Sequence, residues 1–325
     1  MKQLTEINMR LIKKILIAIA VVAFLSIACI YLFIPGELNV SALRLVACNS
    51  SAAFRNIGEG RSGQLWWPKE GYAGARAEGY AGTQADLLRI TAKAYPMMEV
   101  MLEDGVRSLP GKIAITSYQG RDSSAILWNW QVPTGRGPFQ RFLQYRKALE
   151  LRKKTIRSLD SLKTFLEKTE NIYGMEVRHA MSHNGALITT QWVTRSYPST
   201  AEVYRHIDSI RAYISSQGGR EMDYPMLHVG RKDDGNLETM VAVPLNVDLP
   251  KRGSLLSKRF IPWKVIAAEV KGGSARAERA MDQLLQYAAD HQLTLMAIPF
   301  QSLVTDRKQE PDSSRWVTRV MVPVP

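Results

Sequence analysis

The chain has 325 residues, of which 46% are hydrophobic and 22% charged, and its formal net charge is +13. This length suggests about two domains, and the composition excludes a largely disordered chain. The positive charge permits attraction to anionic membranes, acidic ligands or nucleic acid without selecting among them. Two cysteines, Cys29 and Cys48, and five scattered histidines indicate no disulfide framework, metal site or cofactor.

The N-terminus predicts a membrane anchor. A basic segment, residues 1–14, precedes 20 uncharged and mostly apolar residues, 15–34, which is enough to cross a bilayer as a helix. Because Lys and Arg residues concentrate before the apolar stretch, we expect the N-terminus inside the cytoplasmic membrane and the later domains outside it. The alternatives are a cleaved signal peptide or a lipoprotein modified at Cys29.

Residues 37–170 predict an α+β domain. An alternating strand leaves the apolar stretch, and Ser50 or Ser51 would cap a short helix after it. Several strand-like runs separated by turns follow, and then a long amphipathic helix over 139–170. In the last of these runs the apolar side chains alternate onto one face, namely Ile126, Trp128, Trp130 and Val132.

The order of these elements, with "WWP" after the short helix and "SLKTFLEK" in the long one, resembles the START-like (SRPBCC) helix-grip fold. This resemblance implies a sheet wrapped around the long helix, in a family whose members often hold an apolar ligand between the two. Four tryptophans, Trp66, Trp67, Trp128 and Trp130, would then pack in the core or contact such a ligand.

Residues 171–325 contain an internal repeat. Asp208 and Asp282, Tyr213 and Tyr287, and Pro225 and Pro299 are each 74 positions apart, so the apolar face of one helix also recurs. Each copy, about 183–245 and 260–325, reads strand, helix, strand, strand. We expect the two β-α-β-β units to form one curved antiparallel sheet with two helices on one face and a cleft between the copies.

The stretches "KVIAAEVKGG", "IPFQSLVTD" and "EPDSSRWVTRVMVPV" resemble the GyrI-like small-molecule-binding domain, also called the bacterial transcription activator effector-binding domain. The resemblance implies binding of hydrophobic, often cationic molecules in the cleft. The order of anchor, START-like domain and GyrI-like domain is similar to that of a group of bacterial membrane proteins. It implies a single-pass protein of the bacterial cytoplasmic membrane.

The resemblance also argues against catalysis. Some members are thought to be hydrolases that use a glutamate after the threonine of the final strand, but those positions here are Met240 and Arg319. Gln301 and Leu303 occupy the usual acidic and tyrosine positions of the preceding strand, so no catalytic residue is predicted. The residues expected to bind a ligand are Trp192, Trp263, Glu269, Phe300, Gln301, Trp316 and Arg319.

These patterns favour a non-enzymatic, membrane-anchored protein that binds or senses small amphipathic molecules outside the cytoplasm. One alternative is a hydrolase in which Glu269 activates a water in the cleft. Another is a structural or interaction module without a ligand. We expect no nucleic-acid partner, because no helix-turn-helix segment precedes the effector-like domain.

Overall fold

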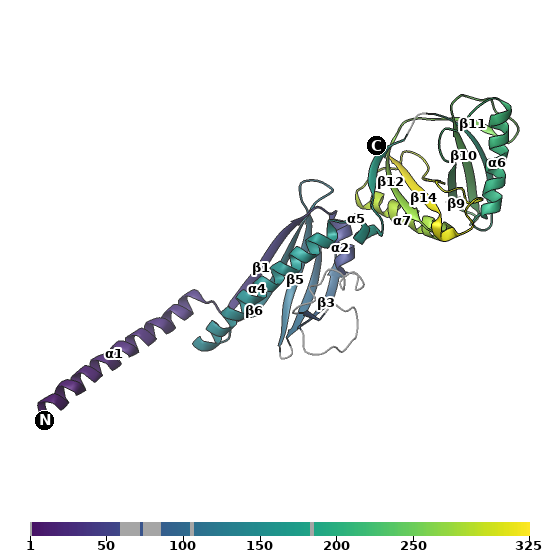
Figure 1. The fold of residues 1–325 in the computed structure, drawn as a ribbon. Helices are drawn as coiled ribbons and strands as arrows, with labels where there is room; N and C mark the ends of the chain where they lie inside the picture. Colours follow the sequence, from purple (N-terminus) through teal and green to yellow (C-terminus); the bar gives the residue numbers. More distant parts are fainter. Residues whose placement is uncertain (1, 59–71, 74–85, 105–106, 183–184) are drawn as a thin grey trace. The chain divides into compact units, whose positions relative to one another are not determined.

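The computed structural model describes residues 2–58, 72–73, 86–104, 107–182 and 185–325. Trp66 and Trp67 of the "WWP" motif lie outside these residues. The chain divides into two compact units, Met1–Glu167 and Lys168–Pro325. Each unit contains one sheet, and an apolar helix begins the chain, which confirms the predicted α+β class (Figure 1).

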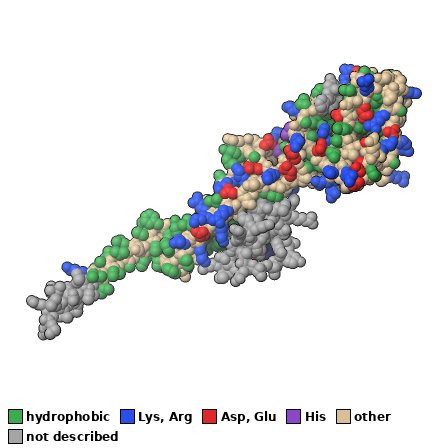
Figure 2. Space-filling model, viewed as in Figure 1, with side chains coloured by type: hydrophobic (Ala, Val, Ile, Leu, Met, Phe, Trp, Pro, Cys, Tyr) green, Lys and Arg blue, Asp and Glu red, His purple; other side chains and the backbone are tan. Residues whose placement is uncertain are grey.

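The first helix, α1 (Lys2–Phe33), contains one stretch, Lys13–Phe33, that is long and apolar enough to cross a membrane. Hydrophobic side chains line this helix on the face shown in Figure 2. None of the stretch is buried against the rest of the protein. A signal sequence near an N-terminus has a similar length and composition.

The N-terminal unit has a six-stranded sheet in the order β1-β6-β5-β4-β3-β2, antiparallel except for the β2–β3 pair. The short helix α2 (Ser50–Gly58) follows β1, and the long helix α4 (Pro138–Leu166) follows β6. The strands are β1 (Glu37–Val46), β2 (Tyr72–Ala73), β3 (Asp86–Ala94), β4 (Met97–Asp104), β5 (Arg107–Ser117) and β6 (Ser124–Pro133).

Helix α4 packs on β1 and β6 to form the core of this unit (Figure 1). The apolar face predicted for β6 is buried there: Trp128 and Trp130 are 1% and 2% exposed. Trp130 Nε1 donates a hydrogen bond to Thr155 Oγ1 of α4 at 2.9 Å, which satisfies a polar group that burial would otherwise penalise. Both tryptophans are therefore core residues.

The cap of α2 differs from the prediction. Asn49 Oδ1, not Ser50 or Ser51, accepts the hydrogen bond of Ser51 N at 2.8 Å. Asn49 also lies within 3.4 Å of Ala52 N, so its side chain satisfies the first turn. Ser50 Oγ instead bonds Ser117 Oγ of β5 at 2.9 Å, which joins the helix to the sheet.

The C-terminal unit has an eight-stranded antiparallel sheet in the order β11-β8-β10-β9-β13-β14-β12-β7. Its helices are α5 (Thr169–Tyr173), α6 (Thr200–Ser216), α7 (Ser274–Asp290) and the 3₁₀ turn η1 (Ser313–Arg315). The strands are β7 (Arg178–Met181), β8 (Gly185–Thr194), β9 (Met226–Arg231), β10 (Leu237–Leu245), β11 (Leu256–Phe260), β12 (Lys264–Lys271), β13 (Phe300–Ser302) and β14 (Val317–Val324).

Two segments of this unit share one arrangement. In β8-α6-β9-β10 and in β12-α7-β13-β14, the last strand lies between the other two. Both helices have 17 residues, and their bounds differ by 74 positions at each end. The two segments meet where β9 pairs with β13, through Leu227 opposite Gln301.

The two outer strands cross over between these segments. Strand β7 precedes β8 in the chain but pairs with β12, through Met181 opposite Lys264. Strand β11 precedes β12 but pairs with β8, through Phe260 opposite Gly185. Each segment is thus completed by the strand that precedes the other one, which joins them into a single sheet.

Helix α6 begins at a sequence-encoded cap and packs on one face of the sheet. Ser199 is the N-cap, and its hydroxyl accepts a hydrogen bond from Glu202 N at 3.2 Å. The helix buries an apolar stripe that includes Ile207 and Ile210, both 0% exposed, against Leu227 of β9 and Val241 of β10. We call the sheet face on which α6 packs the helix-side face.

Candidate functional site

A polar cluster is buried on the helix-side face near the junction of the two segments. Residues directly opposite each other on paired strands share a face. Leu227 lies opposite both Val241 and Gln301, and Gln301 lies opposite Val320, so Gln301 is on the helix-side face. It is 5% exposed, and its Nε2 donates a hydrogen bond to Tyr197 Oη at 3.2 Å.

Arg307 extends this cluster from the segment between β13 and β14. Its guanidinium donates to Thr318 Oγ1 of β14 at 2.9 Å and lies 4.8 Å from the centroid of the Trp316 ring. Its backbone N donates to Tyr204 Oη of α6 at 2.8 Å. We call Tyr197, Tyr204, Gln301, Arg307 and Thr318 the helix-side polar cluster.

Several buried polar atoms on or beside this face have no hydrogen-bond partner among the described residues. They are Trp192 Nε1, Thr239 Oγ1, Gln301 Oε1 and Arg307 Nε. Thr239 lies opposite Trp192 in the pairing of β10 with β8, so these two also share a face. Buried polar groups are normally paired, because an unmade hydrogen bond costs about 1–3 kcal/mol. These four atoms all lie on or beside one face of the sheet, where the described residues leave them without partners.

Burial also determines the charge state of the cluster. It raises the pKa of both Tyr197 and Tyr204, so both phenols stay neutral near pH 7 and can donate a hydrogen bond. It lowers the pKa of Arg307, but an arginine begins so high that it remains protonated. Burial also raises the pKa of Glu278 on α7. The cluster therefore combines neutral hydroxyls with one fixed positive charge.

The structure does not bring the seven predicted ligand residues together. Trp192 and Gln301 are on the helix-side face, and the Trp192 ring stacks on His206 of α6 at 4.0 Å. Glu269 and Arg319 lie opposite each other on the other face and form a partly exposed ion pair at 3.2 Å. Phe300, adjacent to Gln301 along the strand, also belongs to that other face.

The two remaining tryptophans lie beyond the strand ends. Trp263 precedes β12, and its backbone N and O both bond Ser182, which fastens the edge of the sheet. Trp316 follows η1 and stacks on Arg307 while its Nε1 donates to Glu310 O at 2.8 Å. Trp316 is therefore a neighbour of the cluster, and Trp263 is a structural contact of β12.

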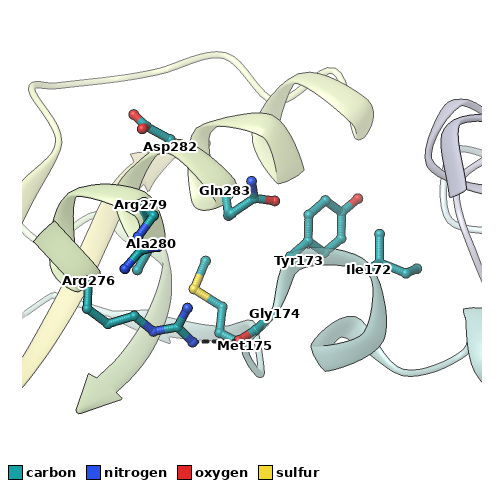
Figure 3. A pocket seen from close by; sticks show the side chains of 9 residues that line it. All are labelled: Ile172, Tyr173, Gly174, Met175, Arg276, Arg279, Ala280, Asp282 and Gln283. Carbon is teal, nitrogen blue, oxygen red and sulfur yellow. Dashed lines mark hydrogen bonds between the residues drawn. The ribbon is translucent and has the colours of Figure 1, made fainter. Parts of the chain in front are cut away.

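A separate cavity of about 290 Å³ lies between α5 and α7 (Figure 3). Tyr173 and Met175 line one side of it and Gln283 another, and the Arg276 guanidinium donates to Gly174 O at 3.0 Å. This hydrogen bond fixes the chain after α5 to α7. The cavity contains none of the buried unpaired atoms, so we place the candidate site at the helix-side polar cluster.

Tyr197 and Arg307 were not among the predicted site residues. Arg307 falls in the polar stretch that precedes the last predicted strand. Tyr197 lies in the short connection before α6, adjacent to Pro198. The sequence signal for Tyr197 is weak, since one tyrosine before a helix cap is common in surface loops. Arg307 gives no local signal at all, because only the tertiary fold buries it.

No family model and no curated protein matches the chain. Solved structures that resemble it include the EcmrR C-terminal domain, with a TM-score of 0.41 and 14% identity over 46% of this chain and 98% of that one. SAV2435 bound to tetraphenylphosphonium has a TM-score of 0.32 and 15% identity over 46% and 94%. A hydrolase from Listeria innocua has a TM-score of 0.35 and 11% identity over 46% and 91%. These values are too low to establish the fold or the function of this chain.

One comparison corrects an expectation about partners. The structure of EcmrR in complex with DNA matches with a TM-score of 0.42 and 16% identity, over 57% of this chain and 70% of that one. This finding contradicts the prediction that the chain has no nucleic-acid partner. That prediction used the absence of a helix-turn-helix motif, and the absence of one motif does not exclude other surfaces of a chain with a net charge of +13.

Proposed function

We propose that the protein is a membrane-anchored, non-enzymatic binding protein for small amphipathic molecules, which it meets outside the cytoplasm. The observation that carries this proposal is the set of buried, unpaired polar atoms on the helix-side face: Trp192 Nε1, Thr239 Oγ1, Gln301 Oε1 and Arg307 Nε. A ligand that supplies both hydrogen-bond donors and acceptors would satisfy them. Aromatic rings beside them offer apolar contact area.

The domain assignments belong to the same proposal. The two segments of the C-terminal unit share strand order and helix length, which supports two copies of one GyrI-like β-α-β-β unit. In the N-terminal unit the first strand pairs with the last, and the final long helix packs on both. This arrangement supports a START-like helix-grip domain.

The anchor is supported by how α1 joins the N-terminal unit. Tyr31 Oη donates to Arg136 O at 2.6 Å, and the Arg141 guanidinium lies 4.5 Å from the Tyr31 ring centroid. Arg141 also donates to Ile34 O at 2.9 Å. These contacts hold the start of α4 beside the end of α1, so a bilayer around α1 would meet both.

The first turns of α4 suit that position, because their large apolar side chains are exposed. Phe139 is 76% exposed, and Phe142 and Leu143 are 46% and 45% exposed. Exposed side chains of this kind beside Arg136 and Arg141 are typical of a helix at the lipid–water interface. The N-terminal unit would therefore lie against the extracytoplasmic surface of the membrane that α1 crosses.

A binding assay on the full-length protein in lipid nanodiscs tests the ligand proposal. We expect at least one of octanoate, octanol and tetraphenylphosphonium to raise the unfolding temperature, since a ligand at 100 times its Kd stabilises by about 2.7 kcal/mol. Gln301→Leu should weaken binding at least fivefold and change stability little, because removal of the unpaired buried Oε1 offsets the loss of the Nε2 hydrogen bond to Tyr197. Calorimetric titration measures the affinity.

Gln191→Leu is the matched control for that variant. Gln191 lies on β8 of the same sheet, but it is exposed, so its replacement should leave binding unchanged. If no member of the panel stabilises the wild-type protein, the proposed function is refuted. Glu269→Gln serves the hydrolase alternative: any esterase activity that persists in this variant would exclude Glu269 as the base.

The anchor is tested separately by fractionation and labelling. We expect the full-size chain to remain in bacterial membranes after carbonate extraction, and a variant without residues 2–34 to be soluble. Lys232→Cys, in a background without Cys29 and Cys48, places a thiol in the exposed turn between β9 and β10. A membrane-impermeant maleimide should label it in intact spheroplasts. Labelling only after lysis would contradict the predicted orientation.

A further inference from the structure

Arg307 is the one Lys or Arg side chain that is buried among the described residues, with 6% of its surface exposed. Its neutral partners are Thr318 Oγ1 at 2.9 Å, Ser274 Oγ at 3.5 Å and the Trp316 ring. Its Nε has no hydrogen-bond partner in the part of the chain that the structure describes. No carboxylate of the described residues forms an ion pair with it, and the two tyrosines beside it, Tyr197 and Tyr204, are neutral near pH 7.

A buried guanidinium without a counter-charge is costly. Removing an ion from water costs several kcal/mol even after the protein relaxes, and one or two neutral acceptors recover only part of that. The ring of Trp316 contributes a cation–π contact worth about 0.5–2 kcal/mol. These contacts do not fully offset the desolvation cost, so an anion that reached Arg307 would stabilise it further.

A second source of positive potential lies beside Arg307. Ser274, whose Oγ is the acceptor of Arg307 Nη1, is the first residue of the 17-residue helix α7. The N-cap of α7 is Gly273, which makes no side-chain cap, and the first turn contains no acidic residue. Among the described residues no side chain caps this turn, and Arg276 N and Ala277 N donate to Gly273 O instead. The helix dipole favours a negative charge at this end.

Helix α6 at the equivalent place in the first segment is different. Ser199 caps it, and Glu202 in its first turn neutralises the dipole. The positive end of the α6 dipole is thus offset by the helix's own residues. Of these two helices, α7 is the one whose N-terminus has no side-chain cap and lies beside a buried cation. The N-termini of α6 and α7 therefore differ in their attraction for an anion.

We propose that Arg307 and the N-terminus of α7 bind an oxyanion, either a carboxylate or a phosphate, that forms the polar end of the amphipathic ligand. This inference rests on the proposed function and adds the charge of the ligand to it. The Arg307 guanidinium supplies the counter-charge, Ser274 supplies a hydroxyl, and Trp316 covers the guanidinium. Because Trp316 is itself partly exposed, a ligand that enters from solvent contacts or displaces its ring.

The test compares ligands of equal chain length and different charge. Octanoate, octanol and octyltrimethylammonium are titrated into the full-length protein in nanodiscs of zwitterionic lipid, with empty nanodiscs subtracted. We expect octanoate to bind at least tenfold more tightly than the other two. Arg307→Met should abolish that preference and leave the unfolding temperature equal or higher, because it removes a buried charge.

Two further variants keep the result interpretable. Arg307→Lys retains the charge but not the planar fork, so it should keep part of the octanoate preference even if Arg307→Met folds poorly. Arg315→Met removes an exposed arginine from the same connection and should change nothing, since 67% of that side chain is exposed. Inorganic phosphate is the remaining arm, and much weaker binding than that of octanoate is expected.

The outcomes separate the two proposals. Equal binding of all three octyl compounds that survives Arg307→Met would overturn the oxyanion inference and leave the proposed function standing. Absence of binding by these three compounds would overturn the oxyanion inference, and absence of binding by tetraphenylphosphonium as well would overturn both proposals. Phosphate binding as tight as octanoate binding would overturn the amphipathic part, because the anion alone would then account for recognition.

Discussion

Gly111→Ala is expected to destabilise the N-terminal unit by about 3 kcal/mol, within the range observed for overpacked cores. Gly111 on β5 lies opposite Trp130 on β6, and a Cβ atom there would come within 2.4 Å of Trp130 Cε3. It would also come within 2.9 Å of Asn129 O, which is backbone and cannot turn aside. Trp130 is fixed in place by Thr155, so the ring has little freedom to retreat.

Hydrogen exchange resolved by peptide measures this loss, because it reports the stability of each unit separately. Protection should fall across β5, β6 and α4 and stay unchanged in the C-terminal unit. Gly36→Ala is the control, since the nearest atom to its new Cβ would be Arg141 Nη2 at 3.9 Å. A smaller ring in the double variant Gly111→Ala, Trp130→Phe should recover part of the loss. Unchanged protection in Gly111→Ala would show that the core around Trp130 is looser than these distances indicate.

Leu227→Ala should destabilise the C-terminal unit by about 2–5 kcal/mol, the usual cost of removing a large buried side chain. Leu227 is 0% exposed on the central strand β9, with Val241 opposite on one side and Gln301 on the other. It packs under α6, where a cavity cannot easily collapse because strands adjoin it on both sides. Binding at the helix-side polar cluster should weaken with it.

The same hydrogen-exchange experiment applies to this variant, but here the C-terminal unit should lose protection and the N-terminal unit should keep it. Protection should fall in β9, β10 and α6 of the Leu227→Ala variant, while β5 and β6 keep theirs. Leu256→Ala is the matched control, because Leu256 lies at the start of the edge strand β11 and is 37% exposed. Loss of protection in both units after Leu227→Ala would contradict the division at Glu167.

Much of the secondary structure could be predicted because the chain alternates so regularly. The apolar residues of β6 and the helical stripe of α4 each follow one period, and both elements lie where the pattern indicates. Strand β7 has no such pattern, since all four of its residues are exposed. It forms because it pairs with β12, which is distant in sequence, and a local sequence pattern gives no information about such a pairing.

The candidate site was harder to predict than the fold. Gln301 was identified by its position in the resembling family and Trp192 as an aromatic near the predicted cleft, and both lie on the helix-side face. Arg319 came from a family position and Glu269 from being a carboxylate on a predicted cleft strand, yet the two pair on the opposite face. Adjacent residues of a strand alternate sides, so a shift of one position changes the face. Arg307 has its meaning only from burial, and in sequence it is one basic residue in a polar loop.

The crossing of β7 and β11 has a consequence for how the C-terminal unit is made. During synthesis one edge of β8 stays unpaired until β11 has been translated. Strand β7 is made before β8 and has no partner until β12 has been translated. Open edges of this kind invite pairing with other chains, and contacts so distant in sequence form slowly. A chain that stopped after the first segment would expose both β8 and β9 as edges. The exposed edges of β8 and β9 are therefore covered only after β11 and β13 have been translated.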